Sequence, residues 1–266
     1  MEGPFVMFRT LRIVLAASLV AAAGLTAGAA ASQTAVPAPA KKTVVLVHGA
    51  WADGTSWSRV IPYLLDAGLN VVAVQNPLAS LEGDVANTTR VINDQPGDVI
   101  LAGHSYGGVV ITEAGNNPKV KALVYVAAFA PKPGESVTSI LSAFPKPAWF
   151  ATLHADAGGY VTWPIESWKS EFATGLPPGE QDVLHATQHP TFYGVNDNAI
   201  GATAAWSTRP AVSVVSQQDH IIPAPLQMLF AQQMHSIVVP VEAGHLAMLT
   251  APEETAKAII TAANSY

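Results

Sequence analysis

The sequence predicts an α/β fold built on one parallel sheet with helices on both faces. Its predicted strands are unbroken apolar runs, a pattern typical of strands that helices bury on both faces. Segments in which apolar residues recur at helical spacing alternate with these runs along the chain. Half of the 266 residues are hydrophobic and 12% are charged, which suits a globular domain with a sizeable buried core.

Apolar, β-branched runs give the strands, and segments with helical spacing give the helices. The predicted strands are residues 43–47, 70–74, the start of 98–111, 120–127, 211–215 and 236–241. The predicted helices are residues 56–67, 84–93, the end of 98–111, 224–234 and 252–263. Pro62 falls in the first turn of its helix, where proline is tolerated, and Pro252 starts the last helix. Gly83 and Asp84 are expected to cap the helix at 84–93.

Residues 131–207 break this alternation with irregular spacing, frequent prolines and dense aromatic side chains. Short helices are expected at 166–173 and 179–188. We interpret the block as a cap, inserted after the fourth strand, that covers the carboxyl edge of the sheet. Some of its aromatic residues must form a small core, and others are expected to line a substrate pocket with residues of neighbouring loops. The tentative pocket residues are Trp51, Trp149, Trp163, Phe192 and Leu246.

The N-terminal segment has the three parts of a secretory signal. Two arginines precede an uncharged, Ala-rich run at 13–25, and Ala29 to Ala31 offer small residues for cleavage. Residues 1–31 are therefore predicted to be a signal peptide that exports the protein to the periplasm or the medium. An uncleaved membrane anchor is the alternative, although alanine and glycine partition weakly into hydrocarbon. Residues 32–42 are predicted to be a disordered leader, and one domain is expected over 43–266.

Charge and cysteine content exclude several classes of function. The net charge is −6, and no basic run follows Lys42, so neither nucleic-acid binding nor stable membrane association after signal cleavage is expected. The chain has no cysteine, which excludes disulfides, thiolate metal sites and a thiol nucleophile.

The third predicted strand ends in Gly103-His104-Ser105-Tyr106-Gly107, and a helix-compatible run follows at once. This is Gly-x-Ser-x-Gly in strand–turn–helix context, the pattern of a nucleophile elbow. The sharp turn holds the serine in a strained backbone conformation, and the two glycines avoid collisions with neighbouring elements. Free N–H groups at the start of the new helix point at the same place. The pattern predicts Ser105 as a nucleophile, with a glycine-rich turn that merely contains a serine as the alternative.

A serine hydroxyl needs a base within hydrogen-bond reach, and that base needs an orienting acid. His245 is the preferred base because its loop lies between the last predicted strand and the last helix, at the sheet edge where Ser105 is expected. His220 is the strongest competitor. His48 and His104 lie inside turns whose role is to place the backbone.

Asp219 is the preferred acid because it follows the strand at 211–215 and falls between the serine and the histidine in chain order. Its alternative role is to cap the helix that follows. Asp182 and Asp197 lie in the cap, and Glu242 lies at the end of the last strand.

A tetrahedral intermediate of acyl transfer needs two N–H donors for its oxyanion. The N–H of Tyr106, directly after the nucleophile, is one expected donor. The loop after the first strand supplies the other, for which Ala50 is preferred and Trp51 is the alternative. Gly49 permits the close approach of that loop.

With these residues the chain resembles the α/β-hydrolase superfamily. It resembles more closely the small esterases that include plant methyl salicylate esterases, hydroxynitrile lyases and their bacterial relatives. The resemblance is carried by residues 45–51, Trp57, residues 103–108, Asp219 and residues 244–249. It implies a six-stranded sheet of order 2-1-3-4-5-6 and Ser105, His245 and Asp219 as a catalytic triad. The lyases place a lysine directly after the catalytic histidine, whereas this chain has Leu246, which resembles the esterases.

These observations predict a serine-dependent carboxylic ester hydrolase that acts on small apolar or aryl esters or lactones. No metal or cofactor is implied, and the expected partner is a small-molecule ester substrate. One alternative is a catalytically silent protein that binds a small ligand on the same fold. The other is an acyltransferase or perhydrolase with the same triad, because an alcohol or a peroxide can replace water. The sequence makes no prediction of the oligomeric state.

Overall fold

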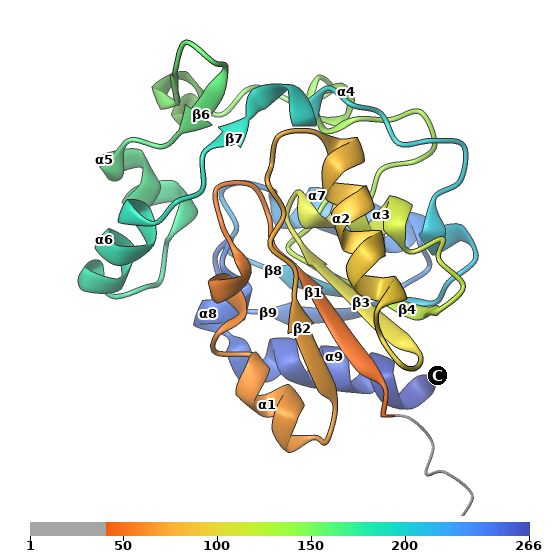
Figure 1. Cartoon of the computed structure of the whole chain (residues 1–266). Coiled ribbons are helices and arrows are strands. Elements are labelled where there is room, and N and C mark those ends of the chain that lie inside the picture. The colour runs from red at the N-terminus through yellow and green to blue at the C-terminus, as the bar shows by residue number, and fades with distance from the viewer. Residues whose placement is uncertain (1–40) are drawn as a thin grey trace, which may run out of the picture. The chain divides into compact units, whose positions relative to one another are not determined.

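A parallel sheet of six strands forms the centre of the domain (Figure 1). The computed structural model describes residues 41–266; the predicted signal peptide and nearly all of the predicted leader lie outside them. The strands are β1 (Thr43–Val47), β2 (Asn70–Ala73), β3 (Val99–His104), β4 (Val120–Val126), β8 (Ala211–Ser216) and β9 (Ile237–Val241). Their order is β2-β1-β3-β4-β8-β9, and every neighbouring pair is parallel. The predicted order is confirmed.

The register brings the loops at the carboxyl edge together in pairs. Val47, the last residue of β1, pairs with Gly103 of β3, so the loop after β1 begins beside the nucleophile turn. Ser216 at the end of β8 pairs with Val241 at the end of β9. The loops that carry the predicted acid and the predicted base therefore start side by side.

Helices cover both faces of the sheet, as predicted. On one face α1 packs against α9, and on the other α2 packs against α3, while α7 packs against β8. These helices are α1 (Ile61–Asp66), α2 (Leu81–Asn93), α3 (Gly107–Ala114), α7 (Ala224–Gln233) and α9 (Pro252–Ser265), with the short α8 (Ala247–Thr250) before the last. None of the helices within residues 41–266 combines the length and the apolarity needed to cross a bilayer.

Two predicted helix starts are wrong. The helix expected at 56–67 is a 3₁₀ turn, η1 (Gly54–Trp57), followed by the shorter α1. Pro62 lies in the first turn of α1, and because it has no N–H and its ring opposes the carbonyl four residues earlier, the helix cannot extend further back. Helix α2 starts at Leu81 because the Ser80 hydroxyl caps it, accepting from the Gly83 N–H at 3.0 Å.

Asp84, which was expected to cap α2, turns into the protein instead. Its side chain is completely buried, and its Oδ1 accepts from the Leu78 N–H at 3.0 Å. The Tyr106 hydroxyl donates to its Oδ2 at 3.1 Å. Burial raises the pKa of Asp84 from 3.8 to about 6, although both hydrogen bonds oppose the change.

Asp84 is expected to make the protein less stable as the pH rises from about 4 to about 6. In this range the folded protein keeps a proton that the unfolded chain has lost, so the free energy of unfolding falls, by up to ~3 kcal/mol for two pKa units. Asp84→Asn removes this titration. The difference in unfolding free energy between variant and wild type should therefore grow in the variant's favour between pH 4 and pH 6.5, as measured by urea denaturation.

The matched control is Asp94→Asn, which removes a carboxylate at the exposed end of the same helix and leaves the Asp84 site unchanged. A difference between Asp84→Asn and wild type that stays constant across the pH series would contradict the prediction.

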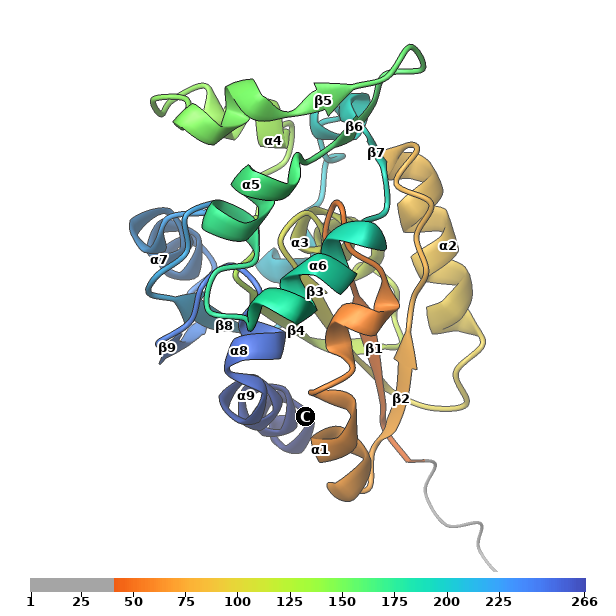
Figure 2. The same ribbon diagram turned by 90° about the vertical axis from the view of Figure 1, so that its left-hand side faces the viewer.

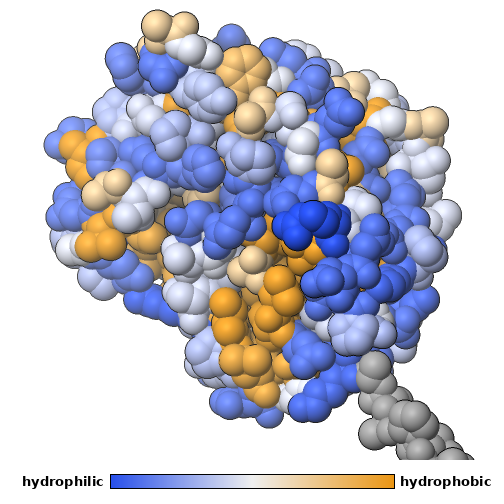
Figure 3. Space-filling model, in the orientation of Figure 1, coloured by the Kyte–Doolittle hydropathy of each residue, from blue (hydrophilic) through white to orange (hydrophobic). Residues whose placement is uncertain are grey.

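The edge strands are less buried than unbroken apolar runs suggest. All four residues of β2 are half-buried, whereas every residue of β3 is buried. On the face shown in Figure 3, apolar side chains gather over β2 and α1, where Leu65 is 54% exposed. The other edge, β9, carries Pro240, which has no N–H to offer a further strand. The difference arises because an edge strand has a neighbour on one side only.

The block between β4 and β8 folds into a cap. It contains a small antiparallel sheet and short helices that lie beside the loop leaving β1 (Figures 1 and 2). Its regular elements are α4 (Val137–Leu141), η2 (Ala148–Thr152), β5 (His154–Ala155), β6 (Tyr160–Thr162), α5 (Ile165–Ser167), α6 (Pro178–Ala186), β7 (Thr191–Phe192), η4 (Tyr193–Asn196) and η5 (Ala205–Ser207). The helix expected at 166–173 is α5 followed by a π-helical turn, η3 (Trp168–Phe172). The helix expected at 179–188 is α6.

Candidate active site

Ser105 sits on a sharp turn between β3 and α3. Its φ is 52°, in the left-handed region that non-glycine residues rarely adopt. A Cβ on Gly103 would lie 2.5 Å from the Gly107 carbonyl oxygen, and a Cβ on Gly107 would lie 2.6 Å from the Val47 carbonyl oxygen. Glycine is therefore required on both sides of the turn, as the sequence pattern predicts.

The structure brings Ser105, His245 and Asp219 into one hydrogen-bonded chain. Ser105 Oγ lies 3.0 Å from His245 Nε2, and His245 Nδ1 lies 2.9 Å from Asp219 Oδ2. A carboxylate can only accept, so the imidazole carries its proton on Nδ1 and leaves Nε2 free to accept from the serine. The His245 and Asp219 side chains are completely buried. The arrangement can deprotonate a serine and hold the resulting imidazolium against a carboxylate.

Four donors hold the Asp219 carboxylate. Oδ1 accepts from the N–H groups of Ile221 and Ile222 at 2.7 and 3.0 Å, in the turn before α7. Asp219 therefore does not cap that helix, whose N-cap residue is Pro223. Oδ2 accepts from His245 and also from Gln227 Nε2 at 2.9 Å. One side chain therefore holds the turn before α7 through Oδ1 and orients the histidine through Oδ2.

Gln227 is a functional candidate that the sequence did not reveal. It is 3% exposed, on the inner face of α7, and its Oε1 accepts from the Ser216 N–H at 3.0 Å. Its Nε2 donates both to Asp219 and to the Ile222 carbonyl. The sequence signal for this role is a glutamine among the apolar residues of the helix, but that signal does not show that its partner is Asp219. Gln227 therefore holds Oδ2, the carboxylate oxygen that also accepts from His245.

Gln227→Met is expected to lower kcat for ester hydrolysis about tenfold, the equivalent of ~1.4 kcal/mol, with KM unchanged. Methionine keeps the length and volume of the side chain but removes the donor that holds Asp219 Oδ2. Steady-state kinetics on purified variants measure the effect. Gln232→Met, at an exposed position of the same helix, is the matched control and should match wild type. Equal kcat in all three proteins would contradict the prediction.

The rejected histidines have other roles. His104 Nε2 donates to the His245 carbonyl at 2.9 Å, and burial and the neighbouring His245 lower the pKa of His104 well below its usual value. His48 donates from Nδ1 to the Gly49 carbonyl, and burial lowers its pKa also. His220 points to the cap, where its Nδ1 lies 3.1 Å from Glu171 Oε2. None of the three contacts Ser105 through a hydrogen bond.

The loop after β1 touches the nucleophile turn. A Cβ on Gly49 would lie 2.7 Å from the Ser105 Cβ. The Trp51 N–H already donates to Thr191 Oγ1 at 3.0 Å, so it is not available to an oxyanion. The N–H groups of Ala50 and Tyr106 have no hydrogen-bond partner among residues 41–266. This arrangement favours Ala50 over Trp51 as the second oxyanion donor.

An aromatic cluster extends from the cap to His245. The Phe172 ring lies edge-on to the imidazole, with centroids 5.0 Å apart, and Trp163 lies 5.6 Å from Phe172. Trp51 and Trp149 pack on Trp163 at 5.6 and 4.7 Å. Three of the predicted pocket residues therefore share this cluster. Phe172, which makes the direct contact with the imidazole, was not among them.

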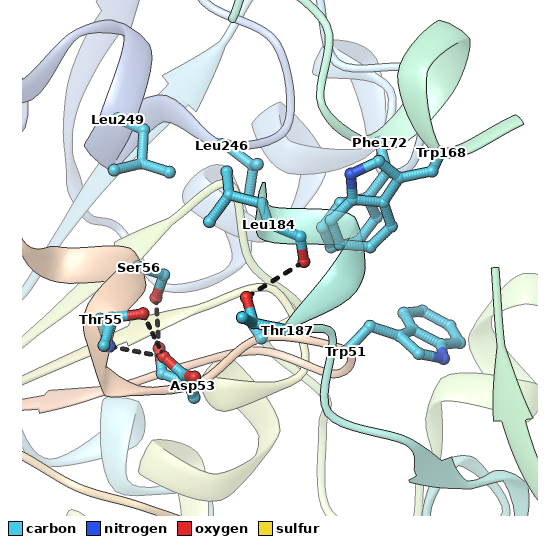
Figure 4. A pocket seen from close by; sticks show the side chains of 11 residues that line it. Trp51, Asp53, Thr55, Ser56, Trp168, Phe172, Leu184, Thr187, Leu246 and Leu249 are labelled. Carbon is cyan, nitrogen blue, oxygen red and sulfur yellow. Dashed lines mark hydrogen bonds between the residues drawn. The ribbon is translucent and has the colours of Figure 1, made fainter. Parts of the chain in front are cut away.

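The other two predicted pocket residues are placed differently. Phe192 packs against Tyr160 in the small sheet of the cap, with centroids 5.6 Å apart. Leu246 lines a small cleft between the cap and the loops of the sheet (Figure 4). Figure 4 shows aromatic side chains on one side of this cleft and Ser56 and Leu249 on the other. The lining residues are Trp51, Ala52, Asp53, Thr55, Ser56, Trp168, Phe172, Leu184, Thr187, Leu246 and Leu249.

Metal-binding side chains do not gather in the part of the chain that the structure describes. No three His, Asp or Glu side chains there come together in an arrangement that could hold a metal ion.

Comparison with protein families matches residues 44–258 to the Alpha/beta hydrolase family. The chain belongs to this family. The hydrolase is 38% identical over 111 residues to the carbendazim hydrolyzing esterase of Nocardioides sp. (strain SG-4G), over 36% of this chain and 46% of that protein. It is 23% identical over 252 residues to methylesterase 8 of Arabidopsis thaliana, over 85% of this chain and 91% of that protein.

Solved structures share its fold. Polyneuridine aldehyde esterase matches with a TM-score of 0.72 at 19% identity, over 83% of this chain and 98% of that chain. The match to the carbendazim esterase spans less than half of that protein, whereas the matches to the methylesterase and to polyneuridine aldehyde esterase span nearly the whole of theirs. The predicted resemblance to small esterases of the α/β-hydrolase superfamily is confirmed.

Proposed function

We propose that this hydrolase is a serine esterase that cleaves small ester or lactone substrates through an acyl-enzyme. The hydrogen-bonded chain from Ser105 Oγ through His245 to Asp219 carries the proposal. Ser105 Oγ attacks the carbonyl carbon while its proton passes to His245 Nε2. The histidine then gives this proton to the leaving alkoxide, and the acyl group stays on Ser105.

The same groups complete turnover. A water molecule attacks the acyl-enzyme, His245 takes its proton and returns it to Ser105, and the carboxylic acid leaves. In both steps the carbonyl oxygen becomes an oxyanion, for which the unoccupied N–H groups of Ala50 and Tyr106 are the proposed donors. Asp219 keeps the imidazole in the tautomer that can accept from the serine.

The proposed substrates are small apolar or aryl esters. The aromatic cluster that begins at Phe172 offers ring faces and edges rather than charges to whatever lies beside His245. Relatives named as a carbendazim hydrolyzing esterase and a methylesterase support a small-molecule ester as substrate. The complete triad favours turnover over a silent ligand-binding role, and transfer of the acyl group to an alcohol or peroxide uses the same intermediate. The signal-like residues 1–31 support the further proposal that the protein is exported.

Two measurements on the purified protein test the proposal together. A panel of p-nitrophenyl and aryl methyl esters is assayed for turnover, and a fluorophosphonate probe is used to label the nucleophile, with the labelled peptide located by mass spectrometry. Turnover together with labelling at Ser105 is the expected result. Absence of both would overturn the catalytic proposal and favour the ligand-binding alternative. Labelling at another serine would overturn the assignment of the nucleophile.

A further inference from the structure

A buried acid–phenol pair lies directly behind the nucleophile turn. The Tyr106 hydroxyl donates to Asp84 Oδ2 at 3.1 Å, and the Leu78 N–H donates to Asp84 Oδ1 at 3.0 Å. Asp84 and Leu78 are completely buried, and Tyr106 is 2% exposed. Tyr106 is the residue after the nucleophile, and its N–H is a proposed oxyanion donor. The backbone of Tyr106 is therefore held in the turn, and its hydroxyl is held by Asp84.

The hydrogen bonds continue from Asp84 to the cap. Leu78 has a φ of 55°, in the left-handed region, and its carbonyl accepts from the Phe192 N–H at 2.9 Å. Phe192 belongs to β7 of the cap sheet. A continuous set of hydrogen bonds and peptide links therefore leads from the residue after Ser105, through Asp84 and Leu78, to β7 of the cap sheet.

Burying the Asp84 carboxyl group against the Tyr106 hydroxyl is not expected to stabilise the fold. A carboxyl group removed from water lowers stability unless it is fully paired, and apolar residues of similar volume often replace buried charges without loss. Costly buried groups of this kind concentrate at functional sites. Ser105, at a φ of 52°, and Leu78 both hold strained backbone conformations, which persist only where the surroundings over-determine them. Asp84 accepts from the hydroxyl of Tyr106, the residue after Ser105, and from the N–H of Leu78.

We propose that Asp84 and Tyr106 are positioning residues that fix the Tyr106 N–H in the geometry of the oxyanion hole and link this geometry to the cap through Leu78. The inference rests on the proposed esterase function, because an oxyanion forms only in acyl transfer. The N–H belongs to the backbone and cannot be removed by substitution, but its direction depends on the side chain that anchors the same residue.

Tyr106→Phe tests the proposal by removing one oxygen atom. The variant is expected to lose about tenfold in kcat for p-nitrophenyl acetate with KM within twofold, less than the ~10²–10³-fold that follows outright loss of one donor. Affinity for an aryl trifluoromethyl ketone, whose hemiketal carries the same oxyanion, should fall by the same factor. Asp84→Asn should keep most of the activity, because its amide can accept from Leu78 and donate to the Tyr106 oxygen.

Tyr125→Phe is the matched control. Its hydroxyl is also buried and lies 2.9 Å from Thr112 Oγ1, and within residues 41–266 it forms no hydrogen bond with Asp84 or Tyr106. It should lower the melting temperature about as much as Tyr106→Phe while leaving kcat and ketone affinity unchanged. The double variant Asp84→Asn/Tyr106→Phe removes both the charge and the phenol, and is expected to fold stably with the low kcat of Tyr106→Phe. Low activity in a stable protein separates positioning from folding.

The outcomes are distinct. The proposal is supported if kcat and ketone affinity fall by the same factor in Tyr106→Phe and in the double variant, while Asp84→Asn alone keeps most of its activity. Wild-type kcat and ketone affinity in either folded Tyr106→Phe protein would overturn it and leave the pair a structural role. A wild-type protein that neither turns over esters nor binds the ketone would overturn the esterase function and this inference with it.

Discussion

Ser105→Ala is expected to lower kcat for ester hydrolysis by about 10⁶-fold, the effect seen when the nucleophile of a serine triad is removed. Without the hydroxyl no acyl-enzyme can form, although the oxyanion donors and the pocket remain. The removed oxygen is the only triad atom that bonds to substrate. Protein stability should change little, because the substitution removes only a hydroxyl group and its one hydrogen bond to His245. Steady-state and burst kinetics with p-nitrophenyl acetate measure the loss.

Ser213→Ala provides the control. Ser213 is a buried serine on β8 whose hydroxyl bonds to Ser236, away from the triad, so its replacement should retain wild-type kcat. Fluorophosphonate labelling should disappear in Ser105→Ala and persist in Ser213→Ala. A Ser105→Ala protein that retains more than about 1% of the wild-type rate, against the ~10⁶-fold loss expected, would show that another group or a directly activated water does the chemistry.

The strands and the nucleophile turn could be predicted because local sequence determines them. Four of the six strands have a neighbouring strand on each side, and their apolar runs follow directly from burial on both faces of the sheet. The glycines at 103 and 107 mark the turn because no other residue avoids the backbone atoms around it. The candidate base and acid could be chosen because parallel strands end at one edge, so that loops far apart in sequence meet there.

The residues that support the triad and the nucleophile turn, Asp84 and Gln227, could not be predicted, because their roles depend on which way their side chains turn. Gly83-Asp84 has the local pattern of a helix cap, but Ser80 takes that role and Asp84 turns to Tyr106. Gln227 is one polar residue on a helix, and only the packing of α7 against the acid loop shows what it holds. These contacts join residues 8 to 22 positions apart.

The aromatic residues of the cap show the same limit. Phe172 and Phe192 both lie in an irregular block with no periodicity that assigns a face. The π-helical turn Trp168–Phe172 places Phe172 against His245, whereas Phe192 in β7 pairs with Tyr160 of β6 in the cap sheet. Sequence spacing could predict that aromatic side chains reach the site, but the choice between these two depends on the cap's own fold.

Asp219→Asn is expected to lower kcat about 10⁴-fold, because it reverses the tautomer of the base. In the wild type, Oδ1 accepts from the N–H groups of Ile221 and Ile222. An asparagine must keep its oxygen there, since its amide group cannot accept from two donors. The amide nitrogen then takes the place of Oδ2 and donates to His245 Nδ1. The imidazole proton moves to Nε2, which faces Ser105 and can no longer accept its proton.

The fold and the hydrogen bonds to Ile221 and Ile222 should survive this change, so the melting temperature should move far less than the rate. Asp197→Asn, at an exposed acid of the cap, is the control and should leave kcat unchanged. Fluorophosphonate labelling should slow in Asp219→Asn in proportion to kcat, because the serine is still present but is not activated. An Asp219→Asn protein within tenfold of the wild-type rate would show that Asp219 holds the turn before α7 without controlling the base. The acid would then have to be sought elsewhere, although no other carboxylate hydrogen-bonds to His245 within residues 41–266.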